Sequence, residues 1–188
     1  MARRISNVIG FDDAPFDRSH RGDVGLVGVV FSGTRLDGVL SSRVRRDGVN
    51  STARMIELVR DSKFAGHVRA VLLQGIAVAG FNVVDVHALS RGLGVPVLVV
   101  ARRRPDLGAI RRALRRTGRG AERKWRLIER AGAMEPLRGV FVQRVGLSLS
   151  EAGEMLAATT LHGLLPEPLR VAHLVAGGLG TGASRGRA

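Results

Sequence analysis

The sequence contains no cysteine and no tyrosine, and it has one tryptophan among 188 residues. Without thiols the chain forms neither disulfides nor thiolate metal sites, so a metal ion must be held by oxygen or imidazole. The five histidines show no pair at metal-ligand spacing, which leaves carboxylates as the first candidates. Aromatic residues make up only 4% of the chain, too few for a broad surface on which bases stack.

Long apolar runs are also absent. The longest, such as residues 95–101, are far shorter than a membrane span, and no sustained apolar stretch follows the basic start of the chain. We therefore expect a cytoplasmic protein in a reducing compartment. With 45% hydrophobic residues and six prolines, residues 1–176 are expected to form one domain, and residues 177–188 a flexible, glycine-rich basic tail.

Positive charge is what the sequence has in excess. The formal net charge is +14, which attracts polyanions. Of the 30 basic residues 28 are arginine; this suits bidentate phosphate contacts, but a GC-rich genome gives the same skew without selection for binding. Residues 102–130 carry twelve basic and three acidic side chains, a net of +9. This segment is either a phosphate-contacting face or a solvated pair of helices.

The first half of the chain predicts three strands and a helix. Residues 5–11, 24–31 and 36–44 have strand patterns, and the short turn at residues 32–35 makes the second and third an antiparallel hairpin. A helix with one apolar face follows from the N-cap residues that begin at Asn50.

The second half alternates buried strands with helices. The predicted elements are a strand over 68–73, a loop at 75–80, a helix over 83–89, a strand over 95–101, helices opening at Pro105 and around Trp125, an edge-like strand over 139–145, a helix from Ser148 to about 161 and a helix opening at Pro166. Three strands followed by helix, strand, helix, strand and helix is the order of the ribonuclease H-like fold, an α/β mixed sheet with flanking helices. In that fold the strand ending near Gln74 lies parallel to strand one.

Two adjacent acids, Asp12 and Asp13, follow the first strand. Ligands of open α/β sheets bind at the carboxyl ends of parallel strands, so these acids should face Gln74. Asp47 ends the third strand at the same edge, and Glu57 could reach it from the first helix. Such carboxylates suit Mg²⁺ or Mn²⁺. The alternatives are that the paired acids cap a turn, that Asp47 shapes another, and that Glu57 is solvated.

Five segments together carry a resemblance to a known family. They are GFDDAPF (10–16), VGVVF (27–31), LLQGI (72–76), AGFNVVD (79–85) and PVLVVARRRPD (96–106). The sequence resembles the archaeal endonuclease dU family over most of residues 5–130. That family is similar to endonuclease V, a metal-dependent repair nuclease with a ribonuclease H-like fold that acts on deaminated bases.

The resemblance implies roles for particular residues. Asp12 matches the aspartate of the Gly-Val-Asp on the first strand of endonuclease V, which makes it the first metal ligand. Gln74 stands where endonuclease V has a second aspartate, so it offers a neutral oxygen and the hold on Mg²⁺ or Mn²⁺ would be weaker. Asp13 or Asp47 would then compensate as metal ligand or catalytic helper.

Further candidates would hold the nucleic acid. Arg102, Arg103 and Arg104 follow a parallel strand and should emerge beside Asp12. Phe16 and Phe81 lie in loops near the proposed site and could hold an extruded base, although hydrophobic packing explains them equally.

Two functions remain open at this stage. The first is metal-dependent cleavage of deaminated, deoxyuridine-containing DNA in repair. The second is a nucleic-acid-binding protein whose nuclease site has degenerated, as Gln74 suggests. A scaffold in a repair or RNA-processing complex is a third possibility, and it would show little affinity for nucleic acid.

Overall fold

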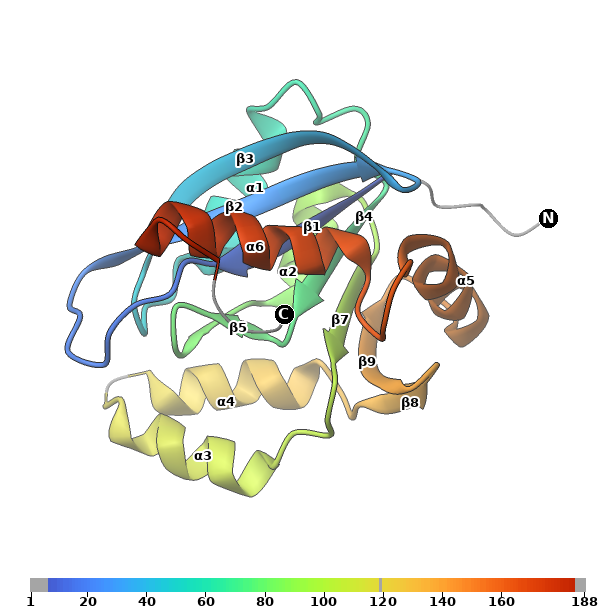
Figure 1. Cartoon of the computed structure of the whole chain (residues 1–188). Helices are drawn as coiled ribbons and strands as arrows, with labels where there is room; N and C mark the ends of the chain where they lie inside the picture. Colours follow the sequence, from blue (N-terminus) through green and yellow to red (C-terminus); the bar gives the residue numbers. More distant parts are fainter. Residues whose placement is uncertain (1–6, 119, 185–188) are drawn as a thin grey trace.

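The computed structural model describes residues 7–118 and 120–184. Its main strands are β1 (Asn7–Asp13), β2 (Asp23–Ser32), β3 (Arg35–Arg45), β4 (Ala70–Gln74), β7 (Val97–Ala101), β8 (Glu135–Leu137) and β9 (Val140–Val145). Within the described residues they form one mixed sheet in the order β3-β2-β1-β4-β7-β9-β8 (Figure 1). The order places β1 near the centre, between the hairpin partner β2 and the parallel strand β4.

The pairing of the strands follows the prediction closely. Strands β1, β2 and β3 are antiparallel neighbours, and β1, β4 and β7 run parallel. The expected edge position of the strand over 139–145 is wrong, because β9 pairs with β7 on one side and with β8 on the other. The short β8, which the sequence did not suggest, forms the edge instead.

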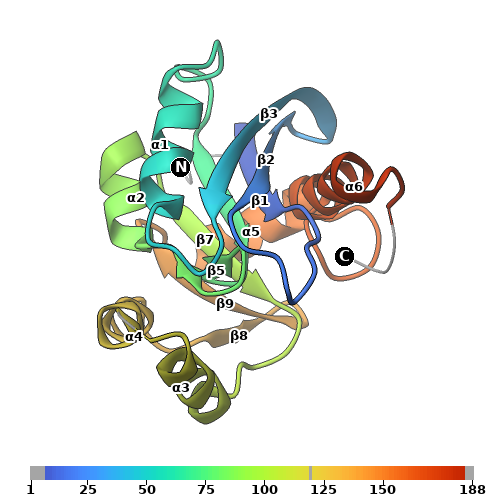
Figure 2. The same cartoon turned by 90° about the vertical axis from the view of Figure 1, so that its left-hand side faces the viewer.

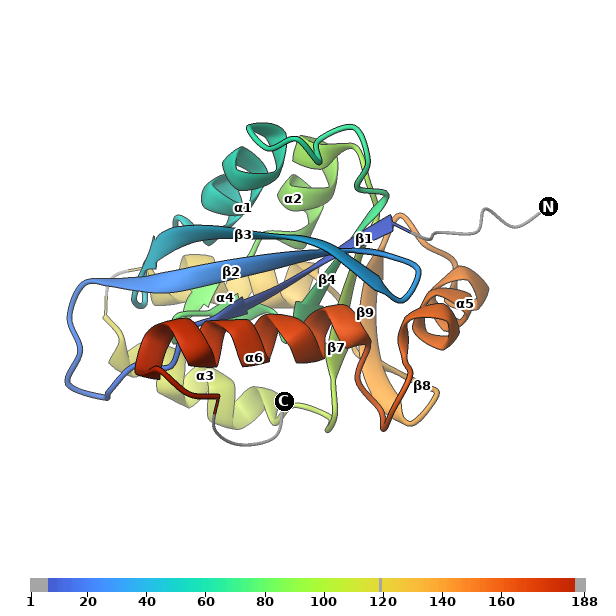
Figure 3. The same ribbon diagram turned by 45° about the horizontal axis from the view of Figure 1, so that its top comes forward.

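Four helices cover the two faces of the sheet. Helices α1 (Ser51–Arg60) and α2 (Val86–Leu93) pack on one face, and α5 (Leu149–Thr159) and α6 (Glu167–Thr181) pack on the other (Figure 3). Because side chains alternate along a strand, each central strand supplies two cores. On β1, Val8 belongs to the core under α6, whereas Ile9 and Phe11 belong to the core under α1 and α2.

Close packing of α6 on the sheet depends on one glycine. A Cβ added at Gly10 would lie 2.5 Å from the carbonyl oxygen of Pro168 in the first turn of α6. Gly10 therefore lets the helix lie directly against β1, two residues before Asp12. Any larger side chain at this position would push α6 away from the sheet.

Helices α3 (Leu107–Arg116) and α4 (Ala121–Arg130) form a helical hairpin outside these layers (Figure 2). Asp106 caps α3, since its side chain accepts a hydrogen bond from the backbone N–H of Ala109 at 2.9 Å. This confirms the helix start predicted from Pro105 and Asp106. In Figure 1 the ends of β4 and β7 point toward the hairpin.

The segment after Gly75 differs from the prediction. Instead of a plain loop and a helix from Val83, it contains a two-stranded hairpin, β5 (Ala77–Val78) and β6 (Asn82–Val83), before α2 starts at Val86. Asp85 sets that start by accepting a hydrogen bond from the backbone N–H of Ala88 at 2.9 Å. The apolar run from Val83 begins in β6 and continues into α2. Its composition alone does not show where the strand ends and the helix begins.

The C-terminal segment also differs from the prediction. The expected tail from Gly177 is helical as far as Thr181, because α6 continues: Ala176 is buried in the core on the sheet, and Gly177 is covered by the chain after the helix, where an added Cβ would lie 3.2 Å from Cα of Ser184. The proposed domain end at residue 176 therefore falls inside a helix, and residues 185–188 lie outside the described residues. Ser148 forms the predicted capping box at the start of α5. Across the residues described, every helix is too short or too polar to cross a membrane.

Candidate active site

The carboxyl ends of β1 and β4 form one side of a cavity. The last paired residues of these strands are Phe11 and Leu73, so Asp12 and Gln74 come next, side by side. Both lie on the face of the sheet that α6 covers, because they follow Gly10 and Leu72 at two-residue spacing, and α6 closes the cavity on that side. The cavity has a volume of about 370 Å³ and is lined by Asp12, Asp13, Pro15, Gln74, His173, Gly177 and Thr181.

Asp12 is held in place by two hydrogen bonds. Its Oδ2 lies 2.8 Å from Nδ1 of His173, and its Oδ1 accepts a hydrogen bond from the backbone N–H of Asp13 at 2.9 Å. The side chain is 15% exposed. Burial raises the pKa of Asp12, and the hydrogen bond with His173 opposes that rise. The acids lie within β1 rather than capping the following turn, so the turn-capping alternative is not what the structure has.

Asp13 is the more strongly perturbed acid. Burial and then the neighbouring charge of Asp12 raise its pKa to about 6, while a hydrogen bond from the backbone of Ala79 works in the opposite direction. Two carboxylates this close resist carrying full charge together. A cation at this position would relieve that repulsion and lower both pKa values.

Gln74 contributes an unpaired oxygen. Its Oε1 is buried and has no hydrogen-bond partner among the described residues. A buried acceptor without a partner costs roughly 1–3 kcal/mol, so this atom marks a position where a bound group would be favourable. Two carboxylates and a free amide oxygen in one cavity fit a divalent cation of the Mg²⁺ or Mn²⁺ type, which prefers oxygen ligands.

The set is short of charged ligands. Over residues 7–118 and 120–184, no three His, Cys, Asp or Glu side chains are grouped as a metal ion would require. The other side-chain oxygens in the lining are neutral, those of Gln74 and Thr181. The fit is that of an ion bound weakly and with several of its own waters.

His173 is the site residue that the sequence did not reveal. It lies on α6, 161 residues from Asp12 in the chain. One signal was present: Leu169, Ala172 and Ala176 mark the buried face of α6, and a histidine at position 173 shares that face. Without knowing which strand α6 covers, that pattern does not identify a partner.

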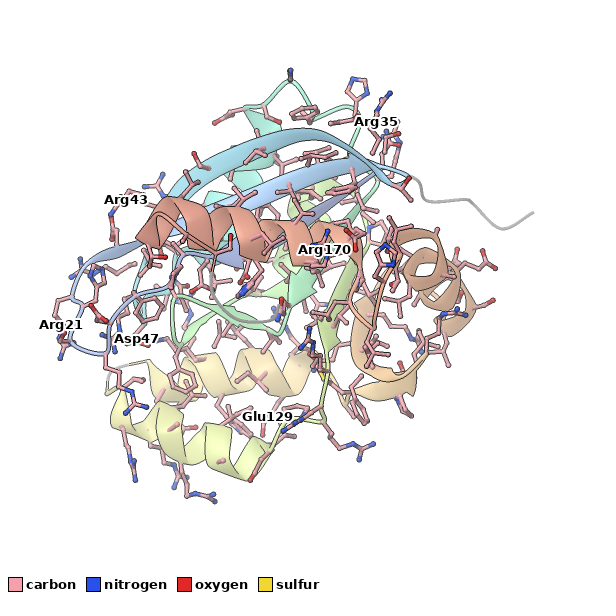
Figure 4. All side chains as sticks on the ribbon, viewed as in Figure 1. Arg21, Arg35, Arg43, Asp47, Glu129 and Arg170 are labelled. Atoms are coloured by element: carbon pink, nitrogen blue, oxygen red, sulfur yellow. The ribbon has the colours of Figure 1, made fainter. Side chains whose placement is uncertain are left out.

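Asp47 lies elsewhere, and both of its carboxylate oxygens already have partners, one through a hydrogen bond and one through an ion pair. It has a positive φ of 51° and is not among the residues that line the cavity. Its Oδ1 accepts a hydrogen bond from the backbone N–H of Phe81 at 2.8 Å, and its Oδ2 lies 3.2 Å from Nε of Arg46. Figure 4 labels it on the side of the molecule that carries Arg21, away from Arg170 on α6. The structure does not bring Asp47 together with Asp12, and its catalytic role stays a prediction.

Glu57 is also outside the cavity. It is exposed on α1 and pairs with Arg54 at 2.9 Å. This geometry is that of an ordinary solvated helix pair. The structure therefore agrees with the simpler interpretation of this residue.

The three arginines after β7 are exposed at the expected edge. Val100 pairs with Gln74, so Arg102, Arg103 and Arg104 leave the sheet on the side where the cavity lies. None of them lines the cavity. The Arg104 guanidinium lies 5.6 Å from the ring centre of Phe141.

The two candidate phenylalanines are in different surroundings. Phe16 lines a larger cavity of about 700 Å³ that shares Pro15 with the first, and the Arg46 guanidinium lies 5.3 Å from its ring centre. Phe81 packs against the apolar cluster that contains Trp125. Only Phe16 lies beside the candidate site.

The chain is similar to known proteins over nearly its whole length. A family model described as endonuclease dU matches residues 4–180. A UPF0215 protein of Deinococcus radiodurans is 56% identical over 184 residues, which cover 98% of this chain and 94% of that protein. Since that organism is a bacterium, the relatives are not confined to archaea.

Solved structures agree in fold. The crystal structure of a protein from Archaeoglobus fulgidus superposes with a TM-score of 0.84 at 34% identity, covering 91% of this chain and 96% of that one. Endonuclease V of Ciona intestinalis, crystallised with a 24-mer DNA containing inosine, gives a TM-score of 0.59 at 15% identity, covering 90% and 83%. These likenesses confirm the predicted ribonuclease H-like fold.

Proposed function

The chain belongs to the endonuclease dU family, and on that premise we propose that it is a metal-dependent endonuclease that cleaves DNA containing deoxyuridine. The observation that carries the proposal is the cavity at the ends of β1 and β4, where Asp12, Asp13 and the unpaired Gln74 oxygen converge. A cavity of this size at the carboxyl ends of parallel strands is a usual place for a ligand.

The metal ion would be held by Asp12, Asp13 and Gln74. When bound, Mg²⁺ or Mn²⁺ supplies the positive charge that stabilises a phosphodiester during hydrolysis. Asp13, whose pKa burial and the charge of Asp12 raise to about 6, would be mostly ionised at neutral pH, and a bound ion would neutralise the charge that it shares with Asp12. The expected dependence on divalent ions therefore follows from the acids themselves.

His173 would position Asp12. When Asp12 is ionised, the 2.8 Å contact requires the proton on Nδ1 of His173, which donates to Oδ2. This bond fixes the orientation of the carboxylate and leaves its second oxygen bonded to the backbone of Asp13. Such supporting bonds commonly change activity about 10- to 100-fold.

The substrate would be held mainly through its phosphates. The net charge of +14 favours a polyanion, and Arg102, Arg103 and Arg104 leave the sheet at the edge that carries the site. Phe16 and Phe81 remain candidates for contact with an extruded base. Of the two, Phe16 is better placed, since its cavity shares Pro15 with the site.

A second candidate function is nucleic-acid binding without cleavage. The observation that favours it is Gln74, which leaves the cavity with two acids and a neutral amide. Such a protein would bind DNA in a salt-sensitive manner and would not cut it in any divalent ion.

A cleavage assay separates the two. Labelled duplexes with a single deoxyuridine, a single inosine or neither would be incubated with the protein in Mg²⁺, Mn²⁺ or EDTA. We expect cleavage of the deoxyuridine duplex in a divalent ion and none in EDTA, with Asp12→Asn lowering the rate by at least about 100-fold. Asp37→Asn is the matched control, because Asp37 pairs with Arg35 at the start of β3.

The outcomes are distinct. Equal cleavage by wild type and Asp12→Asn would contradict the proposed site. Binding without cleavage by the wild type would favour the second function, and preference for the inosine duplex would contradict the proposed base.

A further inference from the structure

The α3–α4 hairpin has an apolar side that fixes it to the rest of the protein. Leu114 of α3 and Trp125 and Ile128 of α4 form a buried cluster with Val83 of β6. This cluster is separate from the two cores of the sheet. The hairpin is therefore a distinct element, attached by its own small core to the β5–β6 hairpin.

A buried lysine fastens the hairpin a second time. Lys124 of α4 is 2% exposed, and its Nζ donates a hydrogen bond to the carbonyl oxygen of Asp47 at 2.5 Å. Burial lowers the pKa of Lys124. Asp47 is also hydrogen-bonded to Ala79 and Phe81. These bonds fix the position of α4 relative to the sheet.

The outer side of the hairpin is a surface of exposed arginines. At helical spacing, Leu114 and Ile128 turn inward and the arginines turn outward. The exposed residues, called here the hairpin arginines, are Arg112, Arg115, Arg116, Arg123 and Arg126.

The charge of the hairpin arginines is not neutralised nearby. Over the described residues none of them forms an ion pair, whereas Arg130 of the same hairpin pairs with Asp85. Two of the three acids between residues 102 and 130 already serve the helices: Asp106 caps α3, and Glu129 accepts the indole N–H of Trp125 at 2.6 Å. A genome rich in GC would account for arginine in place of lysine, but not for five unpaired cations on one hairpin.

The hairpin is also well placed. Figure 1 shows the ends of β4 and β7 directed toward it, and Arg102, Arg103 and Arg104 lead from β7 into α3. A positively charged path thus runs from the site edge onto the hairpin. Figure 2 shows α6, which closes the cavity, on the other side of the strand ends.

We propose that the hairpin arginines form a binding surface for the sugar–phosphate backbone of a nucleic acid, at nucleotides outside the cleaved bond. The choice of nucleic acid as occupant rests on the proposed function and on charge complementarity. The surface holds the substrate and takes no part in the chemical step, because none of its residues lines the cavity.

The test compares two double variants of equal charge. Arg112→Gln/Arg116→Gln removes two hairpin arginines one helical turn apart. Lys63→Gln/Arg69→Gln removes two exposed cations just before β4, at the end of the sheet opposite Gln74. Glutamine keeps helix propensity close to that of arginine, and the thermal midpoint of each protein is measured to check folding.

Binding to a labelled 24-base-pair duplex is measured by fluorescence anisotropy in EDTA, from 50 to 300 mM NaCl. We expect the hairpin variant to lower the slope of log K against log salt by about 1 to 2 and to raise Kd at least about 10-fold at 100 mM. In the control variant, the changes in the salt slope and in Kd should each be less than half of those in the hairpin variant. Equal behaviour of the two variants would overturn the proposal. So would a hairpin variant that loses affinity for polyglutamate, measured in the same way, but keeps its affinity for the duplex.

The readout separates this inference from the proposed function. Binding in EDTA needs no cleavage, so a wild type that never cuts but binds through the hairpin would refute only the nuclease. A wild type that cuts, with a hairpin variant that binds normally, would refute only this surface. Single-turnover cleavage at saturating protein should change less than about threefold in the hairpin variant; a larger loss would contradict a purely holding role.

Discussion

The cavity at β1 and the turn after β3 are two acidic regions at one edge of the sheet, and they differ in how their oxygen atoms are used. In the cavity, Asp12 and Asp13 have raised pKa values and Gln74 has an unpaired oxygen. In the turn, both carboxylate oxygens of Asp47 already have partners, Phe81 and Arg46. An acid serves a ligand only if its bonding capacity is not already used by the fold.

The turn region is built to join segments. Asp47 bonds to Phe81 through its side chain, to Ala79 through its backbone N–H and to Lys124 through its carbonyl. A Cβ at Gly80 would lie 2.5 Å from Oδ1 of Asp47. The fit is close on every side, which indicates a structural function for the turn.

The largest effect expected from this contrast is on stability. Asp47→Ala removes the bond to Phe81 and the contact with Arg46 and leaves a non-glycine, non-Asx residue at positive φ, so the free energy of unfolding should fall by about 2–4 kcal/mol. Urea denaturation measures it. Asp47→Asn, which tolerates the same backbone conformation, should lose less.

The same variants test the division between the regions. Cleavage per folded molecule should stay within about threefold of wild type in Asp47→Asn. If Asp47→Asn is stable but inactive, the contrast between the two regions is wrong, because Asp47 would then be needed for catalysis and not only for stability.

The next effect concerns the cavity and has the opposite sign. The pKa of Asp13 is about 6 in the folded chain, against a usual 3.8. A raised carboxyl pKa means that the folded state binds the proton more tightly, so the contribution to stability is present below pH 3.8 and is lost as the pH rises through 6. Asp13→Asn should therefore stabilise the metal-free protein by about 1–3 kcal/mol at pH 7.5.

The pH dependence is the control for that result. The gain from Asp13→Asn should shrink as the pH falls from 7 to 4, when Asp13 of the wild type is protonated. A gain that is equal at pH 4 and pH 7.5 would show that charge is not its cause.

The smallest effect expected is on metal binding. Gln74→Asp adds a third carboxylate to the cavity, so it should lower the thermal midpoint without metal and increase the upward shift produced by Mg²⁺ or Mn²⁺, by about 2–4 °C for 1 kcal/mol of added binding. Gln143→Asp is a matched control, since Oε1 of Gln143 is also buried and unpaired but does not line the cavity. A metal response equal in both variants would remove Gln74 from the ligand set.

Much of the fold followed from local patterns. The hairpin of β2 and β3, the capping box at Ser148 and the start of α3 at Asp106 each depend on residues close in sequence, and each is confirmed. The tail was missed because glycine content suggested flexibility, whereas α6 continues to Thr181 and Gly180 is small enough for the helix to pack on Pro15, whose Cδ would lie 3.0 Å from an added Cβ.

The site was only partly accessible from sequence. Strand order placed Asp12 beside Gln74, because neighbouring parallel strands end together. Strand order also placed the backbone of Asp47 at this edge, but it does not predict which groups its side chain bonds to. His173 depends on the docking of α6, a contact between distant parts of the chain.

That docking has a consequence for the timing of synthesis. Strand β1 leaves the ribosome early, but the helix that packs over Gly10 and supplies the partner of Asp12 follows 161 residues later. Until α6 arrives, the α6-facing side of β1 has no cover and the carboxylate has no histidine to orient it. On the proposed function, a growing chain lacks one wall of its cavity and the partner of Asp12, so full activity is expected only after α6 has packed on the sheet.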